Sequence, residues 1–188
     1  MGVDIIVREA TIKDTAGIAR VWVDGWKSAY THILPAECLE AVNYDTHEAV
    51  IRQHLTDISR TSAVFVAVED AAQILGVAVV RATQSGPRGF TAELDAIYVL
   101  PSRQHEGVGH RLILEVARWS QTHAHRGLFL WVVRDNPYRR FYKVLGAEPL
   151  NQRQQQTLGN RSVTAVGYAW RDLMDLIRRL GQEVRSMQ

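Results

Sequence analysis

Residues 99–110, with the sequence VLPSRQHEGVGH, join a predicted strand to a predicted helix. The first turn of a helix leaves backbone N–H groups without partners, and the aligned peptide dipoles place partial positive charge there. Gly107 and Gly109 have no side chain that would keep an anion away from this backbone. The stretch therefore predicts a loop that binds a phosphate or diphosphate at the start of a helix.

Two common phosphate-binding motifs do not fit this stretch. A dinucleotide-binding fingerprint needs a further glycine at position 112, which is leucine. A P-loop needs Gly-Lys-Ser/Thr, which the sequence lacks. A Gly-x-Gly pair alone is equally compatible with an ordinary tight turn. Other segments of the chain are therefore needed to distinguish a phosphate-binding loop from such a turn.

Outward from this stretch, strand-like runs alternate with amphipathic segments. Strands are predicted over residues 5–7, 63–69, 74–80, 92–99, 128–133, 147–157 and 162–170. Helices are predicted over residues 11–30, shortly after Pro35, and over 46–55, 107–123, 136–146 and 173–184. Thr11 with Asp14, and Asn136 with Pro137, are typical of helix starts.

The order of these elements predicts the architecture. Closely spaced strands up to residue 99 predict an antiparallel meander, and the strand, helix and strand over 92–133 predict a parallel pair with a right-handed crossover. The fold class is therefore α+β, with a central twisted mixed sheet of about seven strands, flanking helices and an extra C-terminal helix.

Composition excludes several classes of protein. The chain has 188 residues, which fits one domain, and 22 basic residues against 20 acidic ones give a net charge of +2, too balanced to indicate nucleic-acid binding. The single cysteine, Cys38, excludes an internal disulfide and predicts a reducing, cytoplasmic setting. No apolar run approaches the ~20 residues of a membrane span, and no histidine spacing is typical of a metal site.

Several segments together are similar to one known family. Gln104, Gly107 and Gly109 match the signature Q/R-x-x-G-x-G/A, after a strand that ends AIYV at residues 96–99. The segment NPYRRFYKVLGA, residues 136–147, is similar to N-x-x-A-x-x-F-Y-x-x-x-G-F, and WKSAY at 26–30 with ILP at 33–35 looks like one broad subgroup. Over residues 4–170 the chain resembles the GNAT superfamily of acetyl-CoA-dependent N-acetyltransferases.

The chain departs from this family at three positions. His105 stands where many members carry glycine, Glu106 where many carry a basic residue, and Ala147 where phenylalanine is usual. An acid beside a diphosphate weakens binding unless it points away or pairs, for instance with Arg103 or Arg111.

The resemblance implies a GNAT-like fold, with the acetyltransferase domain at residues 1–170. The apolar stripe beyond it predicts a C-terminal helix at 171–188 that packs on the domain or at a dimer interface. The resemblance also implies that the strand over 92–99 bulges and splays from the strand over 128–133, which frees N–H groups for acetyl-CoA. The residues expected to bind the cofactor are Ile97, Tyr98, Val99, Gln104, His105, Glu106, Gly107, Val108, Gly109, His110, Asn136 and Tyr142. No metal is expected.

Acetyl transfer to an amine needs a base and an acid. A free alkylamine has a pKa near ~10.4, so a carboxylate, alone or through water, has to take its proton. Glu93 is our candidate base, with Asp95 or a water as alternatives, and if no bulge intervenes Glu93, Asp95, Ile97 and Val99 share one strand face. Tyr142 is our candidate acid, carried over from the family's Phe-Tyr pair, although a core aromatic would fit the same position.

The acceptor is expected to contact Trp26, Tyr30 and Glu93, because in the family the first helix forms a wall of the acceptor pocket. Trp22 fits core packing better, whereas Tyr30 and His32 are expected to be exposed. The resemblance implies an N-acetyltransferase acting on a small-molecule, amino-acid or peptide amine by direct attack in a ternary complex, with a homodimer as a family-level expectation. The balanced charge and the lack of a long apolar run predict no nucleic-acid or membrane partner. Two alternatives stay open: a non-catalytic acyl-CoA-binding sensor, which Glu106 favours, and a nucleotide-binding module.

Overall fold

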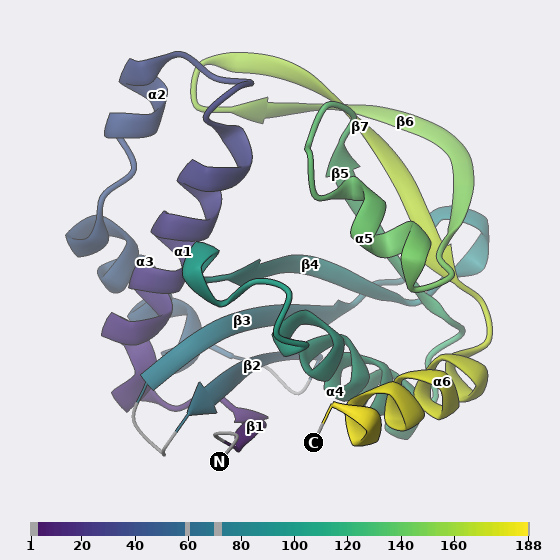
Figure 1. Cartoon of the computed structure of the whole chain (residues 1–188). Helices are drawn as coiled ribbons and strands as arrows, with labels where there is room; N and C mark the ends of the chain where they lie inside the picture. The colour runs from purple at the N-terminus through teal and green to yellow at the C-terminus, as the bar shows by residue number, and fades with distance from the viewer. Residues whose placement is uncertain (1–3, 59–60, 70–72, 188) are drawn as a thin grey trace.

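The computed structural model describes residues 4–58, 61–69 and 73–187. In these residues a seven-stranded sheet has the order β1-β2-β3-β4-β5-β7-β6 (Figure 1). Its strands are β1 Ile5–Glu9, β2 Ser62–Glu69, β3 Gln73–Ala82, β4 Ala92–Val99, β5 Leu128–Val133, β6 Glu148–Leu158 and β7 Arg161–Trp170. The helices are α1 Thr15–Tyr30, α2 Ala36–Glu40, α3 Tyr44–Thr56, α4 Val108–Thr122, α5 Arg139–Val144 and α6 Leu173–Ser186. The predicted α+β fold is confirmed.

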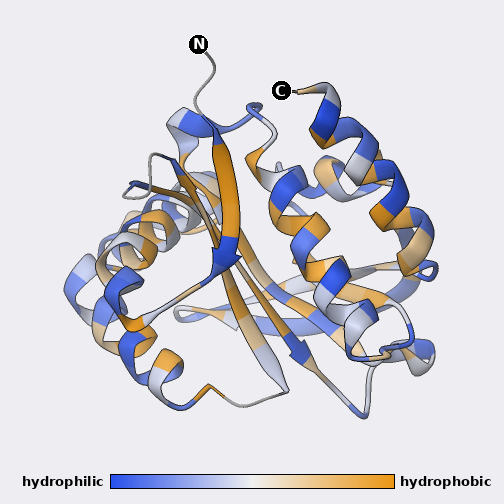
Figure 2. Cartoon of the chain, turned by 90° about the horizontal axis from the view of Figure 1, so that it is seen from below, coloured by the Kyte–Doolittle hydropathy of each residue, from blue (hydrophilic) through white to orange (hydrophobic). Residues whose placement is uncertain are grey.

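Helices cover both faces of the sheet (Figures 1 and 2). Side chains of α1 and α3 pack on one face, and those of α4 and α6 pack on the other. The middle strands β2 and β3 are therefore apolar along almost their whole length, because both of their faces are buried. Of the described residues, no helix is long and apolar enough to cross a bilayer, and no group of three or more acidic, histidine or cysteine side chains is placed to hold a metal ion.

The sheet is split in its middle. β4 and β5 run parallel and pair only at Ala92 with Leu128 and at Glu93 with Phe129. Beyond these residues β4 stays paired with β3, and β5 stays paired with β7, so the two halves of the sheet diverge (Figure 1). The predicted parallel pair is thus confirmed, and the splay leaves a gap between neighbouring strands.

A bulge in β4 changes which residues share a face. Val79 pairs with Ala96 while Val80 pairs with Leu94, so Asp95 is an extra residue in β4. Leu94 consequently joins Ile97 and Val99 in the core beneath α4. Glu93 was expected to share a face with Ile97 and Val99 only in a strand without a bulge. That condition is not met, and the extra residue reverses the alternation, so Glu93 lies on the other face.

Two helix starts differ from the sequence prediction. The chain enters α1 through a short 3-10 turn at Ile12–Asp14, so the α-helix itself begins at Thr15. α5 begins at Arg139 rather than directly after Asn136. The side-chain oxygen of Asn136 accepts the amide of Tyr138 at 2.8 Å, which forms a local turn that delays the helix.

One buried carboxylate joins β1 to the start of α1. Asp14 accepts two hydrogen bonds from Arg8, at 2.8 and 2.9 Å, and one from the amide of Thr11 at 2.7 Å. The Arg8 hydrogen bonds hold the pKa of Asp14 at about 2, against the opposing effect of burial. The carboxylate half of the predicted capping box is therefore present, and it also ties an edge strand to a helix.

We predict that Asp14→Asn lowers the free energy of unfolding at pH 7 by about 1–2 kcal/mol, a value discounted because Arg8 is partly exposed. The pKa of Asp14 in the folded state lies below its unfolded value, so its contribution is complete above about pH 4 and disappears as the pH falls toward 2. Urea unfolding at a series of pH values measures this. A difference between variant and parent that persists unchanged at pH 2 would contradict it, and Asp135→Asn, at an exposed site, is the control.

Candidate active site

The first part of the site is the free edge of β4. The amide of Leu100 donates to the carbonyl oxygen of Leu75, in β3, at 2.9 Å. Because N–H groups point to alternate sides along a strand, the amides of Ile97 and Val99 point away from β3 and toward β5. The β4–β5 ladder has already ended at Glu93. These two amides therefore face the gap without a ladder partner and are available to a ligand.

The second part is the loop that starts α4. Among the described residues, the backbone amides from His105 through His110 have no hydrogen-bond acceptor. The next amide, that of Arg111, donates to the carbonyl oxygen of Gly107 at 3.1 Å. A run of free donors at the positive end of a helix dipole is a site for an anion.

Glycines allow the close approaches that this loop needs. Gly107 has a φ of 78°, in the left-handed region, and His105 has a φ of 66°, which explains why glycine is expected at that position. On β3, a Cβ at Gly76 would lie 2.9 Å from side-chain carbons of both Val108 and Leu112. Glycine there lets the first turn of α4 lie directly on the sheet, beside β4.

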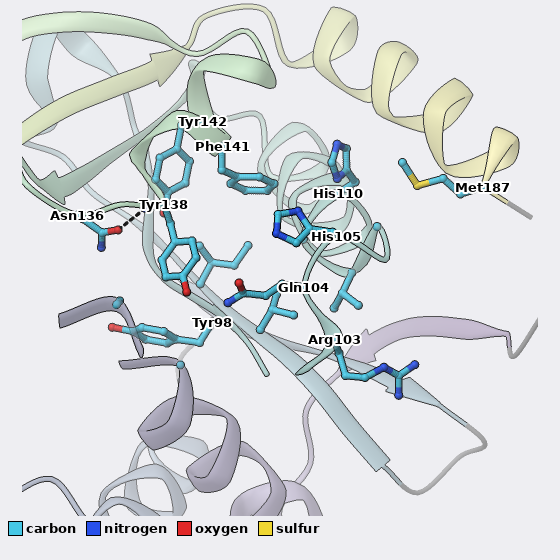
Figure 3. Close-up of a pocket in the computed structure, with 17 residues that line it drawn as sticks. Tyr98, Arg103, Gln104, His105, His110, Asn136, Tyr138, Phe141, Tyr142 and Met187 are labelled. Carbon is cyan, nitrogen blue, oxygen red and sulfur yellow. Dashed lines mark hydrogen bonds between the residues drawn. The ribbon is translucent and has the colours of Figure 1, made fainter. Parts of the chain in front are cut away.

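Residues of both sets, except Glu106, line one cavity of about 340 Å³ (Figure 3). It is lined by most of the residues expected to bind the cofactor: Ile97, Tyr98, Val99, Gln104, His105, Gly107, Val108, Gly109, His110, Asn136 and Tyr142. The others that line it are Gly25, Ala29, Arg103, Tyr138, Phe141 and Met187. Its volume is in the range of small-molecule sites.

Glu106, expected beside the anion, does not line the cavity. Its carboxylate accepts from Nε of Arg103 at 2.8 Å, and Arg103 also donates to both oxygens of Glu69 on β2, at 2.7 and 2.5 Å. The hydrogen bonds that Arg103 donates to Glu69, and then the one it donates to Glu106, raise the pKa of Arg103, which stays charged. The acid in the loop is thus compensated by Arg103, the first of the two arginines considered for this role.

Three tyrosines from different elements interact near the cavity: Tyr30 of α1, Tyr98 of β4 and Tyr142 of α5. Burial, with a smaller effect of Tyr30, raises the pKa of Tyr142 far above its ordinary value. Burial, followed by the effects of Tyr30 and Tyr142, does the same for Tyr98. The ring of Tyr142 packs edge-on against Phe141 and Trp170, with centroids 5.5 and 6.4 Å away. Tyr142 is therefore fixed in place and protonated at neutral pH.

Glu93 lies where the β4–β5 ladder ends, outside the residues that line the cavity. Nη2 of Arg81 is 2.8 Å from Oε2 of Glu93, and Nε of Arg81 donates to Asp95 at 3.0 Å. Burial raises the pKa of Glu93, Arg81 opposes this rise, and Asp95 adds to it. A tethered carboxylate with a raised pKa is suited to proton transfer.

Trp26 and Tyr30 lie together on α1, with ring centroids 5.1 Å apart, and neither lines the cavity. His32 is exposed as expected, but the prediction that Tyr30 is exposed is wrong, since it is only 9% exposed and more buried than Trp22. Side chains of α2, β5 and the β6–β7 hairpin pack around it, a tertiary contact that the helix pattern does not contain.

Some lining residues were not expected from the sequence. Tyr138 OH and Oγ of Ser28 are 2.8 Å apart, so the turn before α5 is linked to α1. A Cβ at Gly25 would lie 3.0 Å from Cβ of Tyr98, and a glycine inside a helix was a usable signal of this close packing. Met187, near the end of the chain, lies against Gly107. The Ser28 and Met187 contacts join distant parts of the chain and have no local signal.

Known proteins match the chain in sequence and in structure. The family model described as "Acetyltransferase (GNAT) family" matches residues 16–147. The uncharacterized N-acetyltransferase YuaI of Bacillus subtilis (strain 168) is 32% identical over 172 residues, which are 92% of this chain and 96% of that protein.

Solved structures share the fold. A GCN5-related N-acetyltransferase from Rhodopseudomonas palustris is similar with a TM-score of 0.70 at 18% identity, covering 92% of this chain and 99% of that one. The PaiA N-acetyltransferase of Thermoplasma acidophilum, solved in complex with coenzyme A, has a TM-score of 0.62 at 19% identity, covering 89% and 99%. With the family model and the sequence relative, these matches identify the chain as a member of the GNAT acetyltransferase family.

Proposed function

We propose that this chain transfers an acetyl group from acetyl-CoA to a primary amine of a small molecule, an amino acid or a peptide. The observation that carries the proposal is that one cavity joins the free amides of His105–His110 to those of Ile97 and Val99. The first set suits a diphosphate and the second suits the carbonyl groups of an extended acyl-pantetheine arm. A single ligand that carries both groups at its two ends would satisfy both sets.

The amides of β4 also serve the reaction itself. As the amine attacks the thioester carbon, negative charge develops on the carbonyl oxygen, and a fixed N–H from Ile97 or Val99 stabilises that charge. These donors are held by the β3–β4 ladder on their other side, so they need little reorganisation when the charge appears.

Two side chains carry out the proton transfers. Glu93 accepts the proton of the acceptor amine, directly or through a water, so that the nitrogen attacks in its neutral form. The C–N bond forms, the C–S bond breaks, and the electron pair leaves on sulfur. Tyr142 donates its hydroxyl proton to that sulfur, which gives an amide and a free thiol. Trp26 and Tyr30 border the acceptor on the side of α1.

A non-catalytic sensor of acyl-CoA is the alternative. Its main support was the acid at Glu106, and the pairing of Glu106 with Arg103 weakens that support. A screen of amines, amino acids, aminoglycosides and peptides with acetyl-CoA, read out as free thiol, tests the proposal. Thiol release with at least one acceptor class is expected. Binding of acetyl-CoA without any release would favour the sensor, and tighter binding of NAD or ATP would overturn both.

We predict that Tyr142→Phe lowers kcat by about 100-fold, because the leaving sulfur loses its proton donor, while the Kd for acetyl-CoA changes less than about twofold. Steady-state kinetics and isothermal titration calorimetry measure the two quantities. Tyr44→Phe, on the exposed surface of α3, is the matched control. An unchanged kcat in Tyr142→Phe would show that another group, or water, supplies the proton.

We predict that kcat/KM rises with pH through the raised pKa of Glu93, since the base has to be ionised. This rise is the acid limb of the pH profile. Glu93→Gln removes the acid limb and lowers kcat/KM. Asp95→Asn removes the negative charge that helps to raise the pKa of Glu93, so it shifts the limb to lower pH. A pH profile that keeps its acid limb unchanged in Glu93→Gln would exclude Glu93 as the base.

A further inference from the structure

A second cavity, of about 210 Å³, lies between β1, α4 and α6 and shares no lining residue with the first. In Figure 2 β1 follows directly from the N-terminus, and the ends of the chain lie at the same side of the molecule. α4 supplies Arg111 and Arg118 to this cavity, and α6 supplies Arg185. Three guanidinium groups therefore surround a small concave site.

The acids around this cavity do not balance these charges. Glu115 is the one carboxylate among the described residues that line it, and this carboxylate is 2.6 Å from Arg118. Glu183, the nearby acid on α6, is 3.5 Å from His110. Within the part of the chain that the structure describes, Arg111 and Arg185 have no ion pair or side-chain hydrogen bond.

The excess positive charge has a free-energy cost that is clearest at Arg111. Its Nε is buried and has no hydrogen-bond acceptor among the described residues. A partly buried guanidinium without a partner loses hydration that nothing in the protein replaces. An external oxyanion would supply the missing acceptors, and the planar fork of arginine binds carboxylate and phosphate oxygens in pairs.

Gly181 gives an independent indication that the cavity is kept open. It lines the cavity in the interior of α6, where glycine costs about 1 kcal/mol relative to alanine. A Cβ added there would meet no atom within 4 Å, so no close packing requires this glycine. The rest of the wall is apolar, from Ile5 and Val7 of β1 and from Leu114 and Val184.

We propose that this cavity binds a small organic oxyanion, a carboxylate or phosphate with a short hydrocarbon part, through Arg111 and Arg185. The hydrocarbon part lies against Val7 and Val184, in the space that Gly181 leaves free. Arg111 follows His110, which lines the first cavity, so both cavities depend on the first turns of α4.

Titrations followed by ¹H–¹⁵N correlation spectra test the proposal without reference to catalysis. The probes are inorganic phosphate, acetate and 2-methylbutanoate. Saturable shifts at the amides of Gly181, Val184 and Arg185 are expected for at least one probe at or below about 10 mM. Shifts at Gly107 and Gly109 report the first cavity separately. If 2-methylbutanoate binds more tightly than acetate, the apolar wall contributes; if phosphate binds most tightly, the ligand is a phosphate ester.

Two variants locate the site. Arg111→Gln is expected to weaken binding at least tenfold, while Arg178→Gln, on α6 outside the cavity, leaves it unchanged. Gly181→Leu fills the cavity with apolar atoms, and it should abolish binding while the melting temperature is kept or raised. The proposal is overturned if no probe shifts the α6 amides, or if Gly181→Leu binds as tightly as the parent chain. Neither result bears on whether acetyl-CoA binds in the first cavity.

Discussion

The structure of the site depends on the short pairing of β4 with β5. These strands lie next to each other in the middle of the sheet, yet their ladder holds only two residues of each. In a continuous β4–β5 ladder, the amides of Ile97 and Val99 would donate backbone hydrogen bonds to β5. Because the ladder stops at Glu93, two free donors line a gap in an otherwise complete sheet, and the cavity opens beside them.

Other contacts stabilise the sheet around this gap. Gly25 lets Tyr98 pack under α1, and the hydrogen bond between Ser28 and Tyr138 links α1 to the segment before α5. β5 keeps its full ladder with β7, so the second half of the sheet is held from its other side. The Arg103 ion pairs with Glu69 and Glu106 fix the loop to β2. The free amides are thus presented on a rigid frame, which lowers the entropic cost of binding a ligand.

Local sequence patterns predicted much of this fold. The bounds of β4 and β5 agree with the prediction residue for residue, because each run of strand-forming residues ends at clear turn signals. The loop at residues 99–110 was predicted for a physical reason, the need of a helix start for a partner. The family resemblance implied a bulge in β4, but its position at Asp95 was not predicted. The burial of Tyr30 and the delayed start of α5 were not predicted either, since each depends on what packs against the segment. The same holds for the cavity beside Arg111, which three separate elements build.

The central claim is that the amides of His105–His110 bind a diphosphate while those of Ile97 and Val99 bind the acyl end of the same ligand. A ¹H–¹⁵N titration with acetyl-CoA, compared with one using acetyl-pantetheine, tests it most directly. Acetyl-CoA is expected to shift both groups of amides, while acetyl-pantetheine is expected to shift only Ile97, Val99 and their neighbours. If acetyl-CoA binds elsewhere on the surface and leaves the amides of His105–His110 unshifted, these amides do not bind the diphosphate.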